Sequence, residues 1–475
     1  MDGTDLCFTP ATELRRLIRA RQLSPVELTS AVLSRIERLN PVLNAFLTVT
    51  ADAARREAKA AEARARGDGA AGPLDGIPYS IKDLEPTAGV RTTYGSKFFE
   101  HNVPAEDGVV ASRLRASGGI LLGKTNTPHF GHRDMCDNLL GPPCRNPWKL
   151  DRTSGGSSGG AGAAIAAGLG PLAHGSDGAG SIRIPSALCG VVGFKPSFGR
   201  VPYHPNADYW SARSHNGPMA RTVRDAALLL NVMAGPDPRD PLTIDVPPED
   251  YLAACDGGIT GLRVAWSPDL GYAANVVHPE VKAIAERSAR RFAELGCRLE
   301  EPRIRWPDPR AFHKIIWEVG VASRYGDRAI ERPDWVEPSL MQMFLNAGRL
   351  SAIDYGKALV ARSTFYQAVR EFFETYDLLL TPQMPVTAWS VEAGPNGGPS
   401  DAEGRPMPFL DRVPFMYPFN LTGYPAANVP CGFTAEGLPV GLQIAGRWHA
   451  DALVLRAAAA FEEAQPWAQH RPPAG

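Results

Sequence analysis

The sequence has almost no net charge and no long uninterrupted apolar run. Its 50 basic and 51 acidic side chains leave a formal charge of −1. A chain without a positive excess is a poor match for nucleic acid or another polyanion. No stretch is apolar for long enough to span a bilayer. We therefore expect neither nucleic acid nor a membrane among its partners.

Cysteine is scarce and scattered along the chain. The seven cysteines form no Cys-x-x-Cys pair and no spacing typical of a zinc site. This usage favours a reducing, cytoplasmic location over an oxidising one. Residues 1–10 contain no basic segment followed by an apolar run, so no signal peptide is predicted.

Short apolar runs alternate with amphipathic stretches over most of the 475 residues. Buried strands are predicted at 79–83, 119–123, 190–194, 262–266 and 378–382. Helices are predicted between them, for example at 109–117, 278–295 and 450–464. This alternation predicts an α/β fold: a single large domain in which helices cover both faces of a mixed, mainly parallel β-sheet.

The first 70 residues are predicted to be mainly helical. Ser24, Pro25 and Glu27 are typical of a helix start, and Ala51 to Arg66 is rich in good helix formers. We expect residues 1–70 to pack as a helical region on a domain formed by residues 71–475. No break in composition separates the two, so we expect one structural unit.

The most unusual stretch runs from Gly155 to Pro185. It contains two clusters of small residues, at 155–160 and 177–181, separated by an Ala-rich apolar segment. Clustered glycines weaken packing but let the backbone come close to another group. Serines beside them are candidates for chemistry, and consecutive backbone N–H groups at 178–181 are suited to stabilising an oxyanion.

Two familiar motifs match formally but are rejected. Residues 118–125 fit the pattern of a phosphate-binding loop, yet the middle of this segment is apolar and is expected to be buried in a strand. Residues 155–159 fit the nucleophile elbow of α/β-hydrolases, which requires a strand directly before the serine. Residues 148–154 are expected to form a loop, so this motif is rejected as well.

Lys82, Ser157 and Ser181 remain as candidate catalytic residues. A serine hydroxyl is a weak nucleophile until a base takes its proton. Lysine can be that base only when burial lowers its pKa enough to leave it neutral. Lys82 lies in a predicted strand with apolar neighbours. The alternative is a surface lysine paired with Asp83 or Glu85, and composition alone favours that interpretation.

The segment from Gly155 to Pro185 resembles the signature sequence of the amidase signature family, whose members are serine amidases with a Ser–Ser–Lys triad. Ser157 and Ser181 are 24 positions apart, as in the family pattern. Further blocks follow in family order at 74–83, 123–126, 145–148, 189–196, 217–222, 418–423 and 437–443. The resemblance therefore covers nearly the whole chain and implies the amidase signature fold.

The resemblance also implies a role for each residue of the site. Ser181 would be the nucleophile, Lys82 the base, and Ser157 the bridging serine, with a cis peptide bond between Gly156 and Ser157. The oxyanion hole would consist of the backbone N–H groups of Gly178, Ala179, Gly180 and Ser181. Side chains that brace this loop would be Ser158, Asp177 and Arg183. Many family members have glycine at position 179, so Ala179 must either adopt a negative φ or accept backbone strain.

The chemistry that the resemblance implies is acyl transfer through an ester on Ser181. It requires no metal, no cofactor and no histidine. His129, His132 and His174 lie near these motifs in sequence and are expected to be loop or packing residues.

Substrate preference should depend on loops that vary within the family. Predicted pocket residues are Phe130, Met135, Tyr209, Trp210, Trp317 and Phe415. Such a lining suits a hydrophobic or aryl group, although more than half of the candidate apolar residues are expected to pack in the core instead. We expect a serine hydrolase for aryl or alkyl amides and anilides, with ester and carbamate (urethane) hydrolysis as side activities. Residues 394–408 are a candidate lid.

Two other functions stay open. The glutaminase component of a tRNA-dependent amidotransferase shares the signature, but it needs a partner chain and polar residues for the amino and carboxylate groups of glutamine. The apolar loops argue against it. A catalytically inactive binding protein is disfavoured because all three predicted catalytic residues are present. A monomer or a homodimer is expected.

Overall fold

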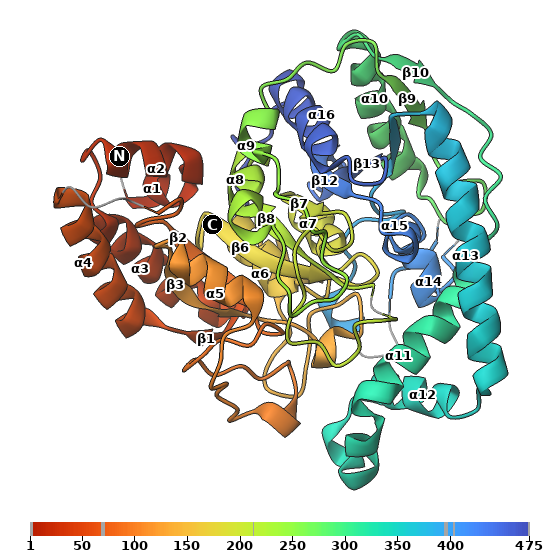
Figure 1. Ribbon diagram of the computed structural model, residues 1–475, viewed down its shortest axis with the longest axis horizontal. Coiled ribbons are helices and arrows are strands. Elements are labelled where there is room, and N and C mark those ends of the chain that lie inside the picture. Colours follow the sequence, from red (N-terminus) through yellow and green to blue (C-terminus); the bar gives the residue numbers. More distant parts are fainter. Residues whose placement is uncertain (1–2, 68–71, 212, 394–397, 402–403, 474–475) are drawn as a thin grey trace.

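The computed structural model describes residues 3–67, 72–211, 213–393, 398–401 and 404–473. In this part of the chain, 11 strands form one sheet in the order β1-β3-β2-β6-β8-β7-β12-β13-β11-β9-β10. Helices cover both faces of this sheet (Figure 1). A separate two-stranded sheet pairs β4 with β5.

The elements have the following bounds. The strands are β1 (Phe46–Val49), β2 (Pro78–Lys82), β3 (Ile120–Thr125), β4 (Arg145–Asn146), β5 (Lys149–Thr153), β6 (Leu172–Asp177), β7 (Val192–Lys195), β8 (His215–Ala220), β9 (Arg263–Trp266), β10 (Arg298–Glu300), β11 (Leu378–Pro382), β12 (Ala426–Phe433) and β13 (Pro439–Gly446). The helices are α1 (Gly3–Phe8), α2 (Ala11–Arg19), α3 (Pro25–Leu43), α4 (Ala51–Arg66), α5 (Val109–Ala116), α6 (Gly159–Ala166), α7 (Arg183–Cys189), α8 (Val223–Met233), α9 (Tyr251–Ala254), α10 (Pro279–Glu294), α11 (Arg310–Glu331), α12 (Pro338–Ala347), α13 (Ala352–Thr375), α14 (Phe409–Arg412), α15 (Tyr417–Thr422) and α16 (Asp451–Ala464).

The sheet is mixed, as predicted. Parallel pairs join β2 to β3 and β6 on one side, and β9 to β10 and β11 on the other. Between these two regions the strands from β6 through β8, β7, β12 and β13 to β11 pair in antiparallel fashion. Strand β1 adds an antiparallel edge to β3. The expected single α/β fold with a mixed, helix-covered sheet is confirmed, and its parallel pairs lie at the two sides of the antiparallel centre.

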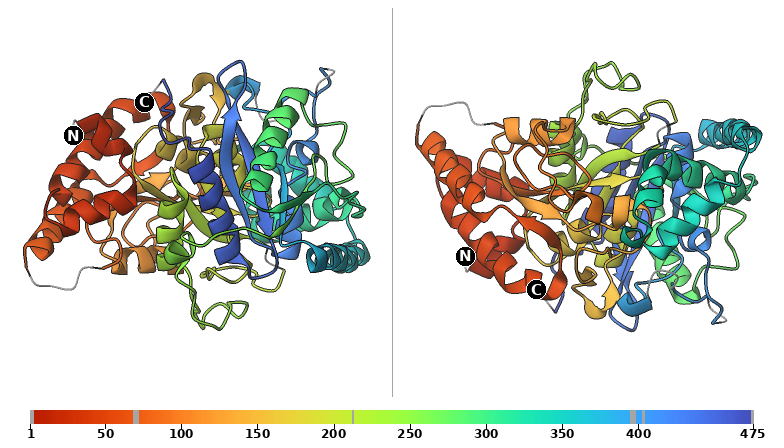
Figure 2. Two further views of the ribbon diagram at one scale, coloured as in Figure 1. Left: turned by 90° about the horizontal axis from the view of Figure 1, so that it is seen from above. Right: turned by 90° about the horizontal axis from the view of Figure 1, so that it is seen from below.

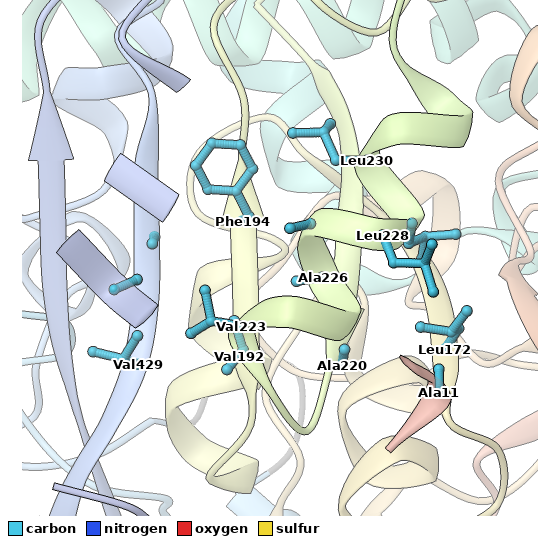
Figure 3. Close-up of a cluster of buried hydrophobic side chains, with 14 of the residues drawn as sticks. Ala11, Leu172, Val192, Phe194, Ala220, Val223, Ala226, Leu228, Leu230 and Val429 are labelled. Atoms are coloured by element: carbon cyan, nitrogen blue, oxygen red, sulfur yellow. The ribbon is translucent and has the colours of Figure 1, made fainter. Parts of the chain in front are cut away.

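The two faces of the central strands are covered by different helices. Figure 3 shows Leu172 of β6 and Phe194 of β7 in a cluster of buried side chains that also includes Val223 and Leu230 of α8. The next residue along β6, Ala173, belongs to a second buried cluster with residues of α6. Successive side chains of a strand point to opposite faces, so β6 is buried between α8 and α6.

The N-terminal helices are tied to the rest of the fold. The backbone N–H groups of Ala11 and Thr12 donate to the Asp225 carboxylate of α8, at 2.8 and 2.9 Å. The Ser24 hydroxyl caps α3 by accepting from Val26 N at 3.0 Å, as the sequence predicts. β1 lies within residues 1–70 and still pairs with β3. The proposed division at residue 70 stays a prediction.

One predicted loop contains a β-hairpin. The loop expected at 148–154 contains strand β5, which pairs with β4. The Asn146 amide donates to the Thr153 carbonyl at 3.1 Å and to the Leu188 carbonyl at 2.8 Å, which fixes the hairpin against α7. Of the candidate lid at 394–408, residues 394–397 and 402–403 lie outside the described part.

A third layer lies beyond the edge of the sheet that carries β11 and β9. It consists of α11, α12 and α13, and α11 packs along both other helices (Figures 1 and 2). Through Trp317, α11 also reaches the centre of the molecule. Among the described residues, no helix combines the length and the apolar character needed to cross a membrane.

Candidate active site

Lys82 is the last residue of β2 and is completely buried. Its strand runs parallel to β6, which brings the ammonium group beside the end of that neighbour. Lys82 Nζ lies 2.7 Å from Ser157 Oγ and 3.2 Å from the carbonyl oxygen of Ser176. The alternative of a surface lysine paired with an acidic neighbour is therefore wrong.

Burial changes the acid–base behaviour of this lysine. Removal from water disfavours the charged form and lowers the pKa of Lys82 to about 7, while the negative charge of Asp177 opposes the shift. A lysine with this pKa is substantially neutral at neutral pH. It can therefore accept a proton from the hydroxyl that it contacts.

Ser157 lies in the tight turn before α6. The peptide bond between Gly156 and Ser157 is cis, as the resemblance implied. A Cβ at Gly156 would lie 2.5 Å from the carbonyl oxygen of Met135, so the turn leaves no space for a side chain there. Strand β5 does precede this turn, which corrects the loop expected at 148–154. That strand belongs to the small hairpin and not to the central sheet.

Ser181 lies in the second glycine-rich turn, between β6 and α7. Its carbonyl oxygen accepts a 3.0 Å hydrogen bond from the N–H of Ser158. The Ser158 hydroxyl in turn donates to the Ser176 carbonyl at 3.2 Å. These bonds join the two serine-bearing turns, and both Ser157 and Ser181 line one cavity.

The predicted oxyanion hole is only partly available. Within the described part of the chain, the N–H groups of Gly178, Ala179 and Ser181 have no acceptor. The N–H of Gly180 instead donates to Asp177 Oδ1 at 2.6 Å, so it is not free to bind an oxyanion. This corrects one of the four predicted donors. Gly180 has φ +117°, whereas Ala179 is not among the residues with positive φ.

Asp177 and Arg183 form a buried ion pair beneath this turn. Arg183 donates through Nε and Nη2 to the two carboxylate oxygens of Asp177, both at 3.0 Å. Burial alone would raise the pKa of Asp177, but Arg183 and a hydrogen bond from Asn420 outweigh it and hold that pKa below its usual value. The Asn420 amide donates to Asp177 at 2.9 Å, and Gln443 accepts from Arg183 at 2.8 Å.

Asn420 and Gln443 also belong to this network, although neither was predicted from the sequence as a site residue. They are 243 and 260 residues away from the partners that they contact. Their only signal was that both lie within blocks of the family resemblance, at 418–423 and 437–443.

The cavity beside the two serines has a volume of about 450 Å³. Gly178, Ser157 and Ser181 form part of its wall. The aromatic residues in the wall are Tyr94, Phe99, Phe130, Tyr203, Trp317, Tyr325 and Tyr355. The charged residues in the wall are Glu85, Asp208, Arg213 and Arg324. The wall thus combines aromatic side chains with more charge than the sequence suggested.

Two of the six predicted pocket residues, Phe130 and Trp317, lie in this wall. The other four do not, and the prediction is corrected for each. Met135 and Phe415 are fully buried in the core. Tyr209 bonds through its hydroxyl to His204, and Trp210 is 78% exposed to solvent.

The histidines near the site are buried. Burial lowers the pKa of His129 to about 4 and that of His174 to about 3, so both are neutral at pH 7. His174 Nε2 bonds to Asn216 Oδ1 at 3.0 Å, and His132 bonds to Ser339 at 2.9 Å. These contacts fit the packing role expected for them. Over the described ranges, no group of three or more His, Cys, Asp or Glu side chains is arranged to hold a metal ion.

The chain is similar to known proteins over nearly its whole length. Residues 27–455 match the family model described as Amidase. The chain is 42% identical to an acylamidase from Rhodococcus erythropolis, over 99% of this chain and 98% of that protein. It is 36% identical to a glutamyl-tRNA(Gln) amidotransferase component from Moorella thermoacetica, over 99% of each. The crystal structure of a bacterial aryl acylamidase of the amidase signature family matches with a TM-score of 0.90 and 33% identity, over 97% of both chains.

Proposed function

Because the chain belongs to the amidase signature family and is an amide-hydrolysing enzyme, we propose that Lys82, Ser157 and Ser181 are its catalytic triad. The observation that supports this most directly is the 2.7 Å contact between Lys82 Nζ and Ser157 Oγ. The contact joins a completely buried lysine to a hydroxyl in the cavity wall. Few positions in a protein interior bring an unpaired lysine to a serine in this way.

The proposed reaction has two halves. Neutral Lys82 takes the proton of Ser157 Oγ, which takes the proton of Ser181 Oγ as this oxygen attacks the acyl carbon. The C–N bond breaks as the same relay returns a proton to the leaving amine. Water then attacks the ester on Ser181, gives up its proton through the relay, and releases the carboxylic acid.

The negative charge that develops on the acyl oxygen needs donors that are already in place. The N–H groups of Gly178, Ala179 and Ser181 are the proposed donors, because they are not engaged elsewhere in the described structure. The ion pair of Asp177 and Arg183 holds the turn that carries them. In comparable enzymes the loss of one such donor costs about 2.7–4 kcal/mol of transition-state stabilisation.

We propose aryl or alkyl amides and anilides as substrates. The cavity of about 450 Å³ and its aromatic wall suit a molecule with one aromatic ring or a short alkyl chain. Esters and carbamates present the same acyl carbon to Ser181 and are proposed as side substrates. A cytoplasmic location and a monomeric or homodimeric state stay predictions.

A glutaminase that works within an amidotransferase is the second candidate. The 36% identity to the amidotransferase component supports it, and so do the charged groups Arg213, Arg324 and Asp208 in the cavity wall. The apolar loops were expected to argue against glutamine, and the charged residues of the wall weaken that argument.

The test compares 4-nitroacetanilide, 4-nitrophenyl acetate, a primary amide, an aryl carbamate and L-glutamine as substrates of the purified chain. We expect hydrolysis of the anilide and the primary amide. A Ser181→Ala variant should lose this activity, and a fluorophosphonate probe should label Ser181 in the parent protein only. Turnover of glutamine alone would favour the glutaminase, and an undiminished Ser181→Ala variant would refute the triad.

A further inference from the structure

Two arginines in the wall of the active-site cavity have no acidic partner. Arg213 comes just before β8, and Arg324 lies on α11. Both line the cavity that contains Ser181. Within the described residues, neither arginine forms an ion pair, and the Nε atom of each is buried without a hydrogen-bond acceptor. The catalytic mechanism proposed above uses neither of them.

The surroundings of Arg213 leave its charge uncompensated. The side chain is buried, with 8% of the residue exposed, and Nη1 donates to the Ile316 carbonyl at 3.3 Å. Its guanidinium carbon lies 4.7 Å from the centre of the Trp317 ring. Burial and the nearby charges of Arg362 and Arg324 lower the pKa of Arg213 to about 9. A buried cation without a partner is unfavourable, so an anion in the cavity would be stabilised there.

Within the described residues, the acidic groups of the same wall form no ion pair with it, although the negative charge of Asp208 acts on the pKa of Arg213 in the direction opposite to burial. Asp208 accepts hydrogen bonds from backbone N–H groups of its own loop, at 3.1 and 3.1 Å. Glu85 accepts a 3.1 Å hydrogen bond from a backbone N–H at the start of α5, and burial raises the pKa of this carboxyl. The side of the cavity that carries Arg213 therefore stays positive.

Trp317 connects this positive side to the predicted oxyanion hole. A Cβ placed on Gly178 would lie 3.2 Å from Cζ3 of Trp317 and 3.2 Å from the hydroxyl of Ser214. The indole ring thus touches the Gly178 turn and also stacks on the Arg213 guanidinium. An anion bound by Arg213 would be separated from the acyl group by little more than the width of one ring.

We propose that Arg213, assisted by Arg324, forms a subsite for a carboxylate on the substrate. The enzyme accordingly prefers amides whose acyl or amine part carries a carboxylate a few bonds from the scissile C–N bond. Guanidinium groups suit this task because they bind carboxylates with two parallel hydrogen bonds. The inference rests on the amide hydrolysis proposed above and narrows its substrate class.

The test uses pairs of substrates that differ in one carboxylate. On the acyl side, the 4-nitroanilide of succinic acid is compared with that of butyric acid. On the amine side, 3-acetamidobenzoate is compared with acetanilide. We expect kcat/KM to be about 10- to 100-fold higher for the charged member of at least one pair. A hydrogen bond to a charged group contributes a free energy that corresponds to a factor of this size. The pair that shows the preference identifies the side of the substrate that meets Arg213.

Variants separate the subsite from a general effect on folding. Arg213→Gln and Arg324→Gln should remove most of the preference, because they lower kcat/KM for the charged substrate much more than for the neutral one. Arg213→Lys should restore part of it because the charge is kept. Arg332→Gln is the control, since Arg332 is exposed and pairs with Asp334 at the surface. It should leave the preference unchanged.

The outcomes are distinct. Equal rates within both pairs, or equal losses on charged and neutral substrates in Arg213→Gln and Arg324→Gln, would overturn the subsite while leaving the amidase function intact. If the parent enzyme hydrolyses none of these amides, the proposed function fails and the subsite falls with it.

Discussion

At the scale of single residues, the proposed role of Lys82 as the base makes the activity depend on its protonation state. Burial lowers the pKa of Lys82 to about 7, so the neutral form that accepts a proton predominates above that pH. We expect kcat/KM for a neutral anilide to fall about tenfold per pH unit below 7 and to level off above it. A pH–rate profile between 5.5 and 9 measures this.

Lys82→Arg provides the control for that profile. Arginine keeps the charge but stays protonated over the whole range, so its activity should be about 10²- to 10⁴-fold lower with no rise near pH 7. A parent profile that is flat from pH 5.5 to 9 would contradict the assignment of Lys82 as the base.

The ion pair between Asp177 and Arg183 is predicted to be essential for stability. Both side chains are fully buried, so Asp177→Asn leaves the Arg183 cation without its counter-charge. Loss of one partner of a buried pair typically costs about 3–5 kcal/mol. We expect the free energy of unfolding in urea to fall by about this amount, with loss of anilide hydrolysis.

An exposed ion pair serves as the control for Asp177→Asn. Asp334 pairs with Arg332 at 3.0 Å, and both side chains are about half exposed or more. Asp334→Asn should leave the free energy of unfolding almost unchanged. Equal losses in the two variants would show that the Asp177 pair contributes no more than a surface pair.

The sequence indicates the proposed catalytic residues more directly than the residues of the pocket. Lys82, Ser157 and Ser181 lie within blocks of the family resemblance, and the structure brings Lys82 to Ser157 and places both serines in one cavity wall. Pocket residues such as Tyr325 and Tyr355 come from separate helices, α11 and α13, and meet only in three dimensions. Apolar residues such as Phe415 have the same composition signal whether they line a cavity or fill the core.

At the scale of elements, helix α6 lies so close to its neighbours that there is no space for a side chain at Gly160. A Cβ on Gly160 would lie 2.3 Å from the backbone nitrogen of Asn126 and 2.4 Å from the carbonyl oxygen of Ala45. Backbone atoms cannot rotate away as a side chain can. Gly160→Ala should therefore lower the free energy of unfolding by about 1–3 kcal/mol, measured by urea denaturation.

The same substitution in open space tests this reasoning. A Cβ on Gly258 would meet no atom within 4 Å, and its φ is not positive. Gly258→Ala should be neutral or slightly stabilising, because alanine restricts the unfolded chain. If Gly160→Ala proves equally harmless, the close approach of α6 to residues 45 and 126 is not what requires glycine.

Elements that depend on local pattern were predicted, and elements that depend on distant pairing were not. The apolar run at 119–123 became β3, and the periodic stretch at 278–295 became α10. The antiparallel centre depends on pairs such as Val192 with Ala220 and Ala426 with Lys195, which no local pattern specifies. Alternating strands and helices favour parallel neighbours, and here that holds only at the two sides of the centre.

At the scale of the whole molecule, the N-terminal and C-terminal segments contact each other. Figure 2 shows the N- and C-terminal segments on the same side of the molecule, and Arg471 forms a 2.9 Å ion pair with Asp5. Trp467 donates through its indole N–H to the Arg221 carbonyl at 2.9 Å, next to α8. Asp225 of α8 also accepts a hydrogen bond from Ala11 at the start of α2. The first and last segments of the described chain are therefore both held at or next to α8.

This arrangement predicts that the helical region at 1–70 does not unfold on its own. Asp225 of α8 accepts from the N–H groups of Ala11 and Thr12 and from the Thr12 hydroxyl at 3.0 Å. Asp225→Ala leaves the buried N–H of Ala11 without a partner, at a cost of about 1–3 kcal/mol. We expect calorimetry to show one transition, shifted to lower temperature, because β1 ties this region to the sheet.

Asp256→Ala is the matched control, since the Asp256 side chain is exposed and its ion pair with Arg224, at 2.6 Å, lies at the surface. It should leave Tm almost unchanged. A different calorimetric result for Asp225→Ala would contradict this prediction: a second transition at low temperature, while the main transition keeps the Tm of the parent protein. Such a result would mean that residues 1–70 melt separately, and that the boundary near residue 70 separates two cooperative units joined mainly through Asp225.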